Sequence, residues 1–177
     1  MIETLQSTNF ILAILGIITL VCAGLLGIDL KTKRALAPLV HAWGLSVAFI
    51  GALGATIFAL VYSEYFGLVP CGFCWFERIL LFPQVILLGT ALWYKDWSIA
   101  RYGIVLSAIG FVISLYHHYI QMGGAEFITC PTSGGSCTQR FFFEFNFMTF
   151  PLMGAIFFAF LIVLYMYILK VSRGVVK

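Results

Sequence analysis

Five long apolar runs constrain the fold more than any other feature of this chain. They span residues 10–28, 40–63, 74–94, 102–121 and 145–169, and only Glu77 and Arg78, near the start of the third run, carry charge. A helix of about 20 residues crosses a hydrocarbon core of ~30 Å, and each run is long enough to do so. Lipid offers no partners for backbone polar groups, and the runs are continuous where strands of a membrane barrel would alternate. We therefore expect an all-α integral membrane protein.

The composition agrees with this fold class and excludes several functions. Of the 177 residues, 62% are hydrophobic and 10% are charged, which is far outside the range of soluble domains. The sequence contains no phosphate-binding loop, no internal repeat and no basic patch for nucleic acid. A lipid bilayer is thus an expected partner, and nucleic acid is not.

The distribution of Lys and Arg predicts the orientation, because positively charged loops stay in the cytoplasm. We therefore expect a cytoplasmic C-terminus and an extracytoplasmic N-terminus. The first run could instead be a cleaved signal peptide, but its start carries Glu3 and no basic residue, which argues against that interpretation. Eight of the ten basic residues would share the cytoplasmic side: Lys31, Lys33, Arg34, Lys95, Arg101, Lys170, Arg173 and Lys177.

Four of the five cysteines fall in the two outer loops of this topology. Cys71 and Cys74 lie between the second and third helices, with Cys74 as the first residue of the third run, and Cys130 and Cys137 lie between the fourth and fifth. The extracytoplasmic side is oxidising in bacteria, so these pairs can form disulfides there. Cys22 lies in the middle of the first run, where we expect a small hydrophobic residue of the packing rather than a reactive thiol.

The first pair has the spacing Cys-x-x-Cys, which closes a short and easily reduced disulfide ring that stabilises a fold little. Pro70 suits a helix start, and Cys74 and Arg78 are neighbours on one helix face. The helix dipole and the arginine both favour a thiolate at Cys74. Arg78 alone could equally be an interfacial anchor, and Glu77 is expected to be solvated or paired with an arginine.

The second pair is separated by six residues rich in glycine and serine, "CPTSGGSC". Such a loop is expected to be mobile and exposed, so its disulfide would be open to attack by a thiolate of another protein. Two alternatives remain for the four cysteines together. They could form two static structural disulfides, or they could bind one zinc ion through four thiolates.

Together these motifs resemble the bacterial disulfide bond formation protein B (DsbB) family, and more closely its short-loop members of the BdbC type. The resemblance covers roughly residues 40 to 170 and includes both cysteine pairs. It also includes "CWFERILLFP" from Cys74, "YHHYIQ" at the end of the fourth run and "FMTFPL" at the start of the fifth. It implies a four-helix transmembrane bundle core in residues 39–177. Residues 1–38, which we expect to form an extra N-terminal transmembrane helix and a cytoplasmic loop, depart from the family pattern, and we expect this helix to serve packing or assembly.

The function implied by the resemblance is a quinone-coupled thiol oxidase in the bacterial cytoplasmic (inner) membrane. It would reoxidise a thioredoxin-fold protein of the DsbA type outside the membrane and pass the electrons to ubiquinone or menaquinone. A similar helical bundle with two cysteine pairs works reductively in quinone enzymes of the vitamin K epoxide reductase type, and relative potentials decide the direction.

The resemblance also implies a role for each site residue. Cys130 would form a mixed disulfide with the partner, Cys137 would leave and attack Cys71, and Cys74 would face the quinone. The second loop is shorter than in proteobacterial members, so the order of attack stays open. The residues expected to contact the quinone are Arg78 and His117.

The remaining histidines and aromatic residues have more ordinary interpretations. His117 and His118 point about 100° apart on a helix, so only one of them can serve one site. We expect His118 near lipid headgroups and His41 at the opposite interface. The run "RFFFEFNFMTFP" is expected to form an outer aromatic girdle or a short interfacial helix, with a lid over the quinone as the alternative.

Overall fold

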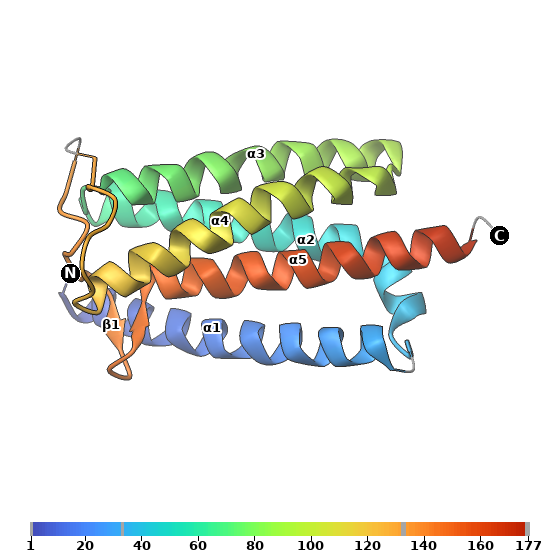
Figure 1. The fold of residues 1–177 in the computed structure, drawn as a ribbon, viewed down its shortest axis with the longest axis horizontal. Helices are drawn as coiled ribbons and strands as arrows, with labels where there is room; N and C mark the ends of the chain where they lie inside the picture. The colour runs from blue at the N-terminus through green and yellow to red at the C-terminus, as the bar shows by residue number, and fades with distance from the viewer. Residues whose placement is uncertain (1, 33, 132–133, 176–177) are drawn as a thin grey trace.

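The computed structural model describes residues 2–32, 34–131 and 134–175 and shows a bundle of long helices running along one axis (Figure 1). Each helix contains a stretch long and apolar enough to cross a membrane, which confirms the expected all-α membrane fold. Lys33 and Lys177, two of the expected cytoplasmic basic residues, lie outside the described residues, as do Thr132 and Ser133 of the second cysteine loop. The five helices are α1 (Ile2–Lys31), α2 (Ala37–Leu60), α3 (Gly72–Tyr94), α4 (Ala100–Gln121) and α5 (Phe150–Val175).

Two short helical turns adjust the ends of these helices. A π-helical turn, η1 (Val61–Tyr65), continues α2, and a 3-10 turn, η2 (Trp97–Ile99), leads into α4. Turns of the π type are often found beside functional sites. Near η2, the ring of His41 stacks on Trp97 at a centroid distance of 5.0 Å.

The expectation of a helix from residue 145 is wrong, because a small hairpin precedes the last helix. Strands β1 (Phe143–Glu144) and β2 (Met148–Thr149) pair antiparallel, and α5 begins at Phe150. Phe145 and Asn146 between the strands have φ angles of 54° and 63°, in the left-handed region that tight hairpin turns use. Hydropathy alone does not reveal such a turn.

Helix α5 is the centre of the bundle and contacts α1, α2 and α4. Glycines bring α4 close to it: a Cβ on Gly103 would lie 2.5 Å from the ring of Tyr165, and a Cβ on Gly110 would lie 2.6 Å from the ring of Phe158. Small residues at such interfaces let membrane helices approach closely and gain packing energy, since apolar burial drives little association in lipid.

A buried polar group ties α3, α4 and α5 together inside the bundle. Oε1 of Gln84 accepts hydrogen bonds from the hydroxyl of Tyr165 at 2.9 Å and from Oγ of Ser107 at 3.2 Å. All three side chains are fully buried. Unpaired polar groups are costly in such surroundings, so this network favours one alignment of the three helices.

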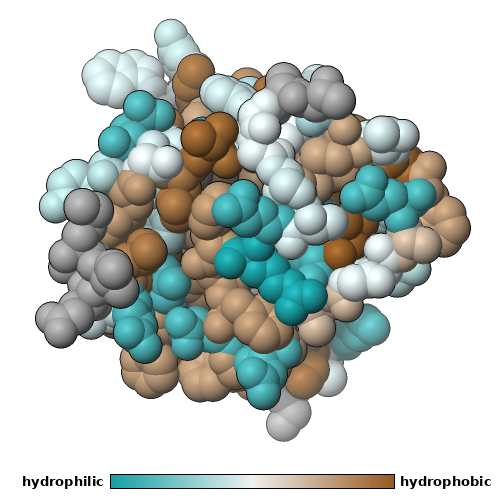
Figure 2. All heavy atoms as spheres, turned by 90° about the vertical axis from the view of Figure 1, so that its left-hand side faces the viewer, coloured by the Kyte–Doolittle hydropathy of each residue, from teal (hydrophilic) through white to brown (hydrophobic). Residues whose placement is uncertain are grey.

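The two ends of the bundle differ in character. The start of α1, both cysteine segments and the hairpin lie at the left end in Figure 1, whereas the α1–α2 and α3–α4 connections lie at the right end. Figure 2 views the cysteine end and shows hydrophilic and hydrophobic residues interspersed. Large apolar side chains such as Ile50 and Ile86 are exposed along the helices, as lipid contact requires.

Candidate functional site

The first cysteine pair lies at the N-terminus of α3. Cys71 is the residue before the helix, and its Sγ accepts a hydrogen bond from the backbone N–H of Cys74 at 3.3 Å. A side chain in this position satisfies a backbone donor that has no partner within the helix and lies at the positive end of the helix dipole. The helix start was expected, but it favours the sulfur of Cys71 over that of Cys74.

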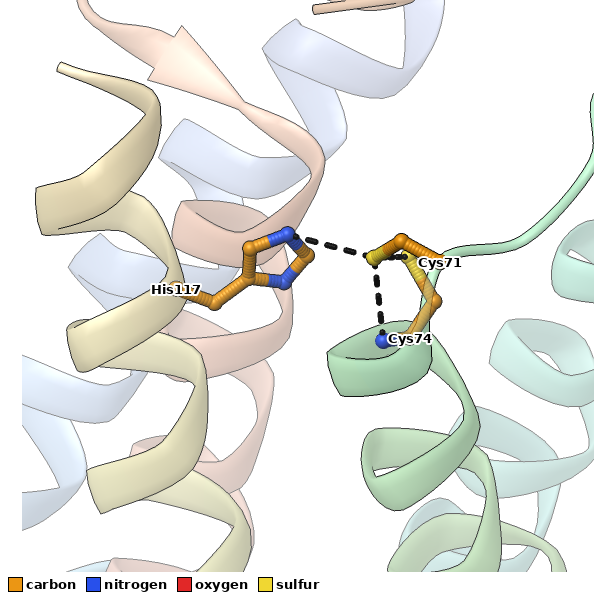
Figure 3. A group of neighbouring side chains, drawn as sticks. All are labelled: Cys71, Cys74 and His117. Carbon is orange, nitrogen blue, oxygen red and sulfur yellow. Dashed lines mark hydrogen bonds between the residues drawn. The ribbon is translucent and has the colours of Figure 1, made fainter. Parts of the chain in front are cut away.

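The sulfur of Cys71 has further hydrogen-bond partners, shown in Figure 3. It lies 2.8 Å from Sγ of Cys74 and 3.5 Å from Nε2 of His117, and Cys71 is 4% exposed. The hydrogen bond with the Cys74 thiol lowers the pKa of Cys71, and the bond and charge of His117 lower it further, against the opposing effect of burial. The geometry therefore favours a thiolate at Cys71, where the sequence had suggested Cys74.

His117 joins the cysteine pair to a carboxylate on α3. Its Nδ1 lies 3.0 Å from Oε1 of Glu77, and its side chain is fully buried while that of Glu77 is 18% exposed. Nε2 of Gln121 lies 3.4 Å from Nε2 of His117 and donates to the carbonyl of Gln139 at 3.1 Å. The result is a continuous series of contacts from Cys71 through His117 to Glu77.

Glu77 is the site residue that the sequence interpretation missed. We had expected it to be solvated or paired with an arginine, whereas its partner is a histidine 40 residues away. The available signal was an acidic residue one helical turn after Cys74 in a run without other acids, because ionisable groups in membrane helices are functional candidates by default.

A large apolar cavity of about 400 Å³ opens beside the cysteine pair, between α1, α2, α3 and α5. Among its walls only a few side chains carry polar or ionisable groups, notably Cys74, Glu77 and Arg78. A second cavity of about 50 Å³ is lined by Cys71, Cys74, Glu77 and His117. Cys74 and Glu77 therefore line both cavities, and together with Phe141 and Phe150 they form the boundary between them.

Arg78 borders the large cavity but is oriented differently from the expectation. Its Nη2 donates to the carbonyl oxygen of Ala59 at 2.8 Å, just before the π turn of α2, and its guanidinium lies 5.4 Å from the ring centroid of Trp75. The guanidinium of Arg78 is thus hydrogen-bonded to the backbone of α2, whereas the sequence had placed it beside the sulfur of Cys74. Its charge still faces the cavity that Cys74 lines.

The second cysteine pair forms a disulfide, Cys130–Cys137, which removes two of the thiolates that a four-cysteine zinc site needs. Cys137 is 1% exposed and packs in one buried cluster with Cys71, Phe73 and Ile120, whereas Cys130 is half-buried. The expectation of an exposed pair is therefore wrong for Cys137.

Glycine explains why this loop lies against the first pair. The backbone N–H of Gly135 donates to the carbonyl of Pro70 at 3.4 Å. Gly134 has a φ of +110°, and a Cβ there would lie 2.3 Å from the same oxygen. Only a residue without a side chain fits this approach, which brings the two cysteine segments together.

The other expected residues have separate positions. Nδ1 of His118 lies 2.7 Å from Oγ1 of Thr149 in β2, away from the cysteine pair. The aromatic run divides: Phe141 and Phe150 line the large cavity, Phe142 is buried, and Phe145 is 47% exposed. The run thus contributes two residues of the cavity wall as well as exposed aromatic residues, and it forms a hairpin where an interfacial helix was considered.

The chain is similar to known proteins over most of its length. The family model described as "Disulfide bond formation protein DsbB" matches residues 41–168. A "Probable disulfide formation protein C" of Bacillus cereus is 37% identical over 127 residues, which are 71% of this chain and 87% of the relative. A "Disulfide bond formation protein C" of Bacillus subtilis is 34% identical over 131 residues, which are 73% of this chain and 94% of the relative. No solved structure gives a significant match.

Proposed function

The chain belongs to the DsbB family of disulfide bond formation proteins, and from this premise we propose that it is a quinone-coupled thiol oxidase. Its role in disulfide formation is that of a membrane protein-disulfide oxidoreductase. In the proposed reaction it accepts two electrons from a thioredoxin-fold protein of the DsbA type. It then passes them to a membrane quinone, either ubiquinone or menaquinone.

The observation that carries this proposal is the position of Cys74 and Glu77 on both cavities. One cavity adjoins the thiol of Cys71 and the imidazole of His117, and the other is apolar and large enough for part of a lipid-soluble ligand. A thiol and a carboxylate on the common boundary can carry electrons and protons between an aqueous dithiol and a ligand in the membrane.

The residues of the large cavity fit a quinone. Its walls are mainly aliphatic and aromatic, as an isoprenoid tail requires, and Cys74, Glu77 and Arg78 give it reactive and charged groups for a polar ring. A volume of about 400 Å³ lies within the range of small-molecule sites. We propose that Arg78 and the Cys74–Glu77 boundary would hold the ring, with His117 behind that boundary.

The outer pair would accept electrons by thiol–disulfide exchange. A partner thiolate attacks Sγ of Cys130, the Cys130–Cys137 bond breaks, and Cys137 leaves with the electron pair as a thiolate. The partner's second thiolate then attacks its own sulfur in the mixed disulfide, so that the partner leaves oxidised and both outer cysteines are reduced. The greater exposure of Cys130 supports its role as the point of entry.

The buried position of Cys137 beside Cys71 supports the next exchange. The Cys137 thiolate attacks Sγ of Cys71 in the inner disulfide, the Cys71–Cys74 bond breaks, and Cys74 leaves as a thiolate. Cys130 then attacks Cys137, which restores the outer disulfide and releases Cys71.

A bound quinone would take up two electrons and two protons as the inner disulfide forms again. His117 contacts Cys71 at Nε2 and Glu77 at Nδ1, so its ring can hold a proton beside the Cys71 thiolate and release it to the carboxylate. Glu77 would hold that proton at the wall of the large cavity. Arg78 would stabilise negative charge on an oxygen in the cavity.

We also propose that the cysteine end of the bundle faces the extracytoplasmic side. Lys31, Lys95, Arg101 and Lys170 lie towards the opposite end, and positively charged loops favour the cytoplasm. The N-terminus would then be extracytoplasmic and the C-terminus cytoplasmic. A reduced partner outside the membrane could reach Cys130 directly.

Anaerobic assays with purified protein test the proposal. The protein is mixed with a reduced thioredoxin-fold partner and a short-chain quinone, and quinone absorbance is followed. We expect Cys74→Ala to abolish quinone reduction and Cys22→Ala to leave it unchanged, because Cys22 is exposed on α1. Retained quinone reduction by Cys74→Ala would contradict the proposed route.

One observation favours a second candidate, a metal site. Cys71, Cys74 and His117 offer ligand atoms that all lie within 4.8 Å of one another, and zinc binds sulfur and imidazole ligands of this kind. Metal analysis of the same preparation distinguishes the candidates. One zinc ion per chain, together with thiols of Cys71 and Cys74 protected from alkylation, would favour the metal site over the redox pair.

A further inference from the structure

We infer that α1 forms one wall of the quinone pocket and limits how bulky a ligand the pocket can hold. This inference rests on the proposed function and assigns a role to a helix outside the family match, which begins at residue 41. The large cavity is bounded by α1 as well as by α2, α3 and α5, so the matched region alone does not enclose it.

The α1 residues at the cavity lie on a single helix face. Their spacing follows i, i+3, i+4 and i+7, which places side chains in one stripe along a helix. Residues on other faces of α1, such as Ile11 and Ile18, are more than half exposed, as expected for lipid contact. The stripe consists of Leu12, Leu15, Gly16 and Thr19.

Hydrogen bonds hold α1 in place near both of its ends. At the cysteine end, the hydroxyl of Tyr62 donates to Oδ1 of Asn9 at 2.6 Å, and both side chains are buried. At the other end, the carboxylate of Asp29 accepts from the hydroxyl of Tyr167 and from the backbone N–H of Leu36 at 3.0 Å. These bonds fix α1 against α2 and α5, so the wall is a defined part of the fold.

The same wall leaves space for a ligand because small residues line it on both sides. Gly16 of α1 and Gly54 of α2 border the cavity. Apart from its chain neighbours and the backbone of its own helix, a Cβ on Gly54 would meet no atom of the described residues within 4 Å, and the nearest atoms to one on Gly16 would be side-chain atoms of Met153 and Met148 at 3.6 Å or more. Larger side chains on this face would therefore fill the cavity without clashing with backbone.

A matched pair of α1 variants tests the inference. Thr19→Phe places a ring on the cavity face, and Ile18→Phe places the same ring on the exposed face one residue away. The measured quantity is the amount of a short-chain ubiquinone or a short-chain menaquinone bound per purified chain. We expect Thr19→Phe to weaken binding about tenfold or more, as steric mismatches in apolar pockets do, and Ile18→Phe to bind like the original chain. The thermal unfolding midpoint of each variant reports whether it is folded.

Photolabelling of the unmodified chain gives an independent result. An azido-substituted short-chain quinone should label a peptide containing residues 12–19 as well as peptides of α2, α3 or α5. Labelling confined to α2–α5, or equal quinone binding by folded Thr19→Phe and Ile18→Phe, would overturn the role of α1 and leave the proposed oxidase intact. Failure of the unmodified chain to bind either quinone would overturn both.

Discussion

Cys71 is the residue whose chemistry the surrounding structure changes most. Its sulfur is hydrogen-bonded to the Cys74 thiol, to a backbone N–H and to His117. These contacts favour the thiolate and thereby stabilise the reduced inner pair. Stabilising the reduced form makes a dithiol pair a stronger oxidant, which is the property that the proposed reaction requires of an inner pair that accepts electrons from the outer pair.

The lowered pKa of Cys71 predicts its pH dependence. In a chain carrying Cys130→Ser and Cys137→Ser, iodoacetamide should alkylate Cys71 at pH values well below ~8.5, the usual thiol range. His117→Ala should move the inflection of the alkylation rate towards that range. Inflections near the usual thiol value in both chains would contradict a thiolate at Cys71.

The lowered pKa of Cys71 also determines how the stability of the reduced protein changes with pH. Because the pKa of Cys71 is lower in the folded protein than in the unfolded one, the thiolate stabilises the reduced fold fully above the usual thiol range. This contribution should decline as the pH falls and disappear below the lowered pKa. The denaturant midpoint of the reduced protein, compared with that of Cys71→Ala across pH, measures this difference.

Glu77 is expected to act through its contact with His117. Glu77→Gln keeps the shape of the side chain but removes the negative charge, and loss of a positioned proton carrier typically slows a reaction by about 100-fold or more. In Glu77→Gln, the rate at which quinone oxidises the inner dithiol should therefore fall by about 100-fold or more.

Glu64 provides the matched control for this experiment, since it is an exposed glutamate in η1. Glu64→Gln should leave the oxidation rate unchanged. Similar rates for Glu77→Gln and Glu64→Gln would show that the carboxylate beside His117 carries no proton in the reaction.

Individual site residues were predictable to different degrees. The cysteine pairs and His117 could be identified because their types and spacing are unusual in a membrane chain. The contacts of Glu77 with His117 and of Arg78 with Ala59 could not be predicted, because each contact joins two helices and packing sets how each helix is rotated about its axis. The position of Cys71 just before the helix could be assigned only once the structure showed that the helix begins at Gly72.

Among the helices, the α4–α5 contact depends on glycine. Gly110→Leu would drive a side chain into the ring of Phe158 and should lower the free energy of unfolding by about 1–3 kcal/mol. Gly24→Leu is the matched control, because in the part of the chain that the structure describes a Cβ there meets no atom of another helix within 4 Å. Unfolding in mixed detergent micelles compares them, and equal midpoints would contradict the close α4–α5 packing.

The number and approximate position of the helices followed from hydropathy, because each must cover the thickness of a bilayer. The start of α5 could not be predicted in this way, because residues 145–149 continue the uncharged run but take part in a hairpin. The left-handed conformation of Phe145 and Asn146 depends on local backbone pairing, which an average over many residues does not detect. The cavity wall formed by α1 depends on how α1 packs against the other helices, so hydropathy could not predict it either.

At the scale of the whole molecule, the two ends of the bundle predict one membrane orientation. With the cysteine end outside, a fluorescent protein fused after residue 177 should mature in the cytoplasm, and alkaline phosphatase fused at the same place should be inactive. A membrane-impermeant thiol reagent should reach reduced Cys130 in intact cells. An active phosphatase fusion would reverse the orientation.

The most direct test of the proposed electron route separates the inner pair from the outer pair. Chains carrying Cys130→Ser and Cys137→Ser are reduced, mixed anaerobically with a short-chain quinone, and analysed by mass spectrometry for a disulfide between Cys71 and Cys74. We predict that this disulfide forms in proportion to the quinone reduced, because Cys74 of the inner pair lines the apolar cavity, whereas neither Cys130 nor Cys137 does. The proposed route would be contradicted if quinone oxidised the unmodified chain but left Cys71 and Cys74 reduced in the chain that carries Cys130→Ser and Cys137→Ser.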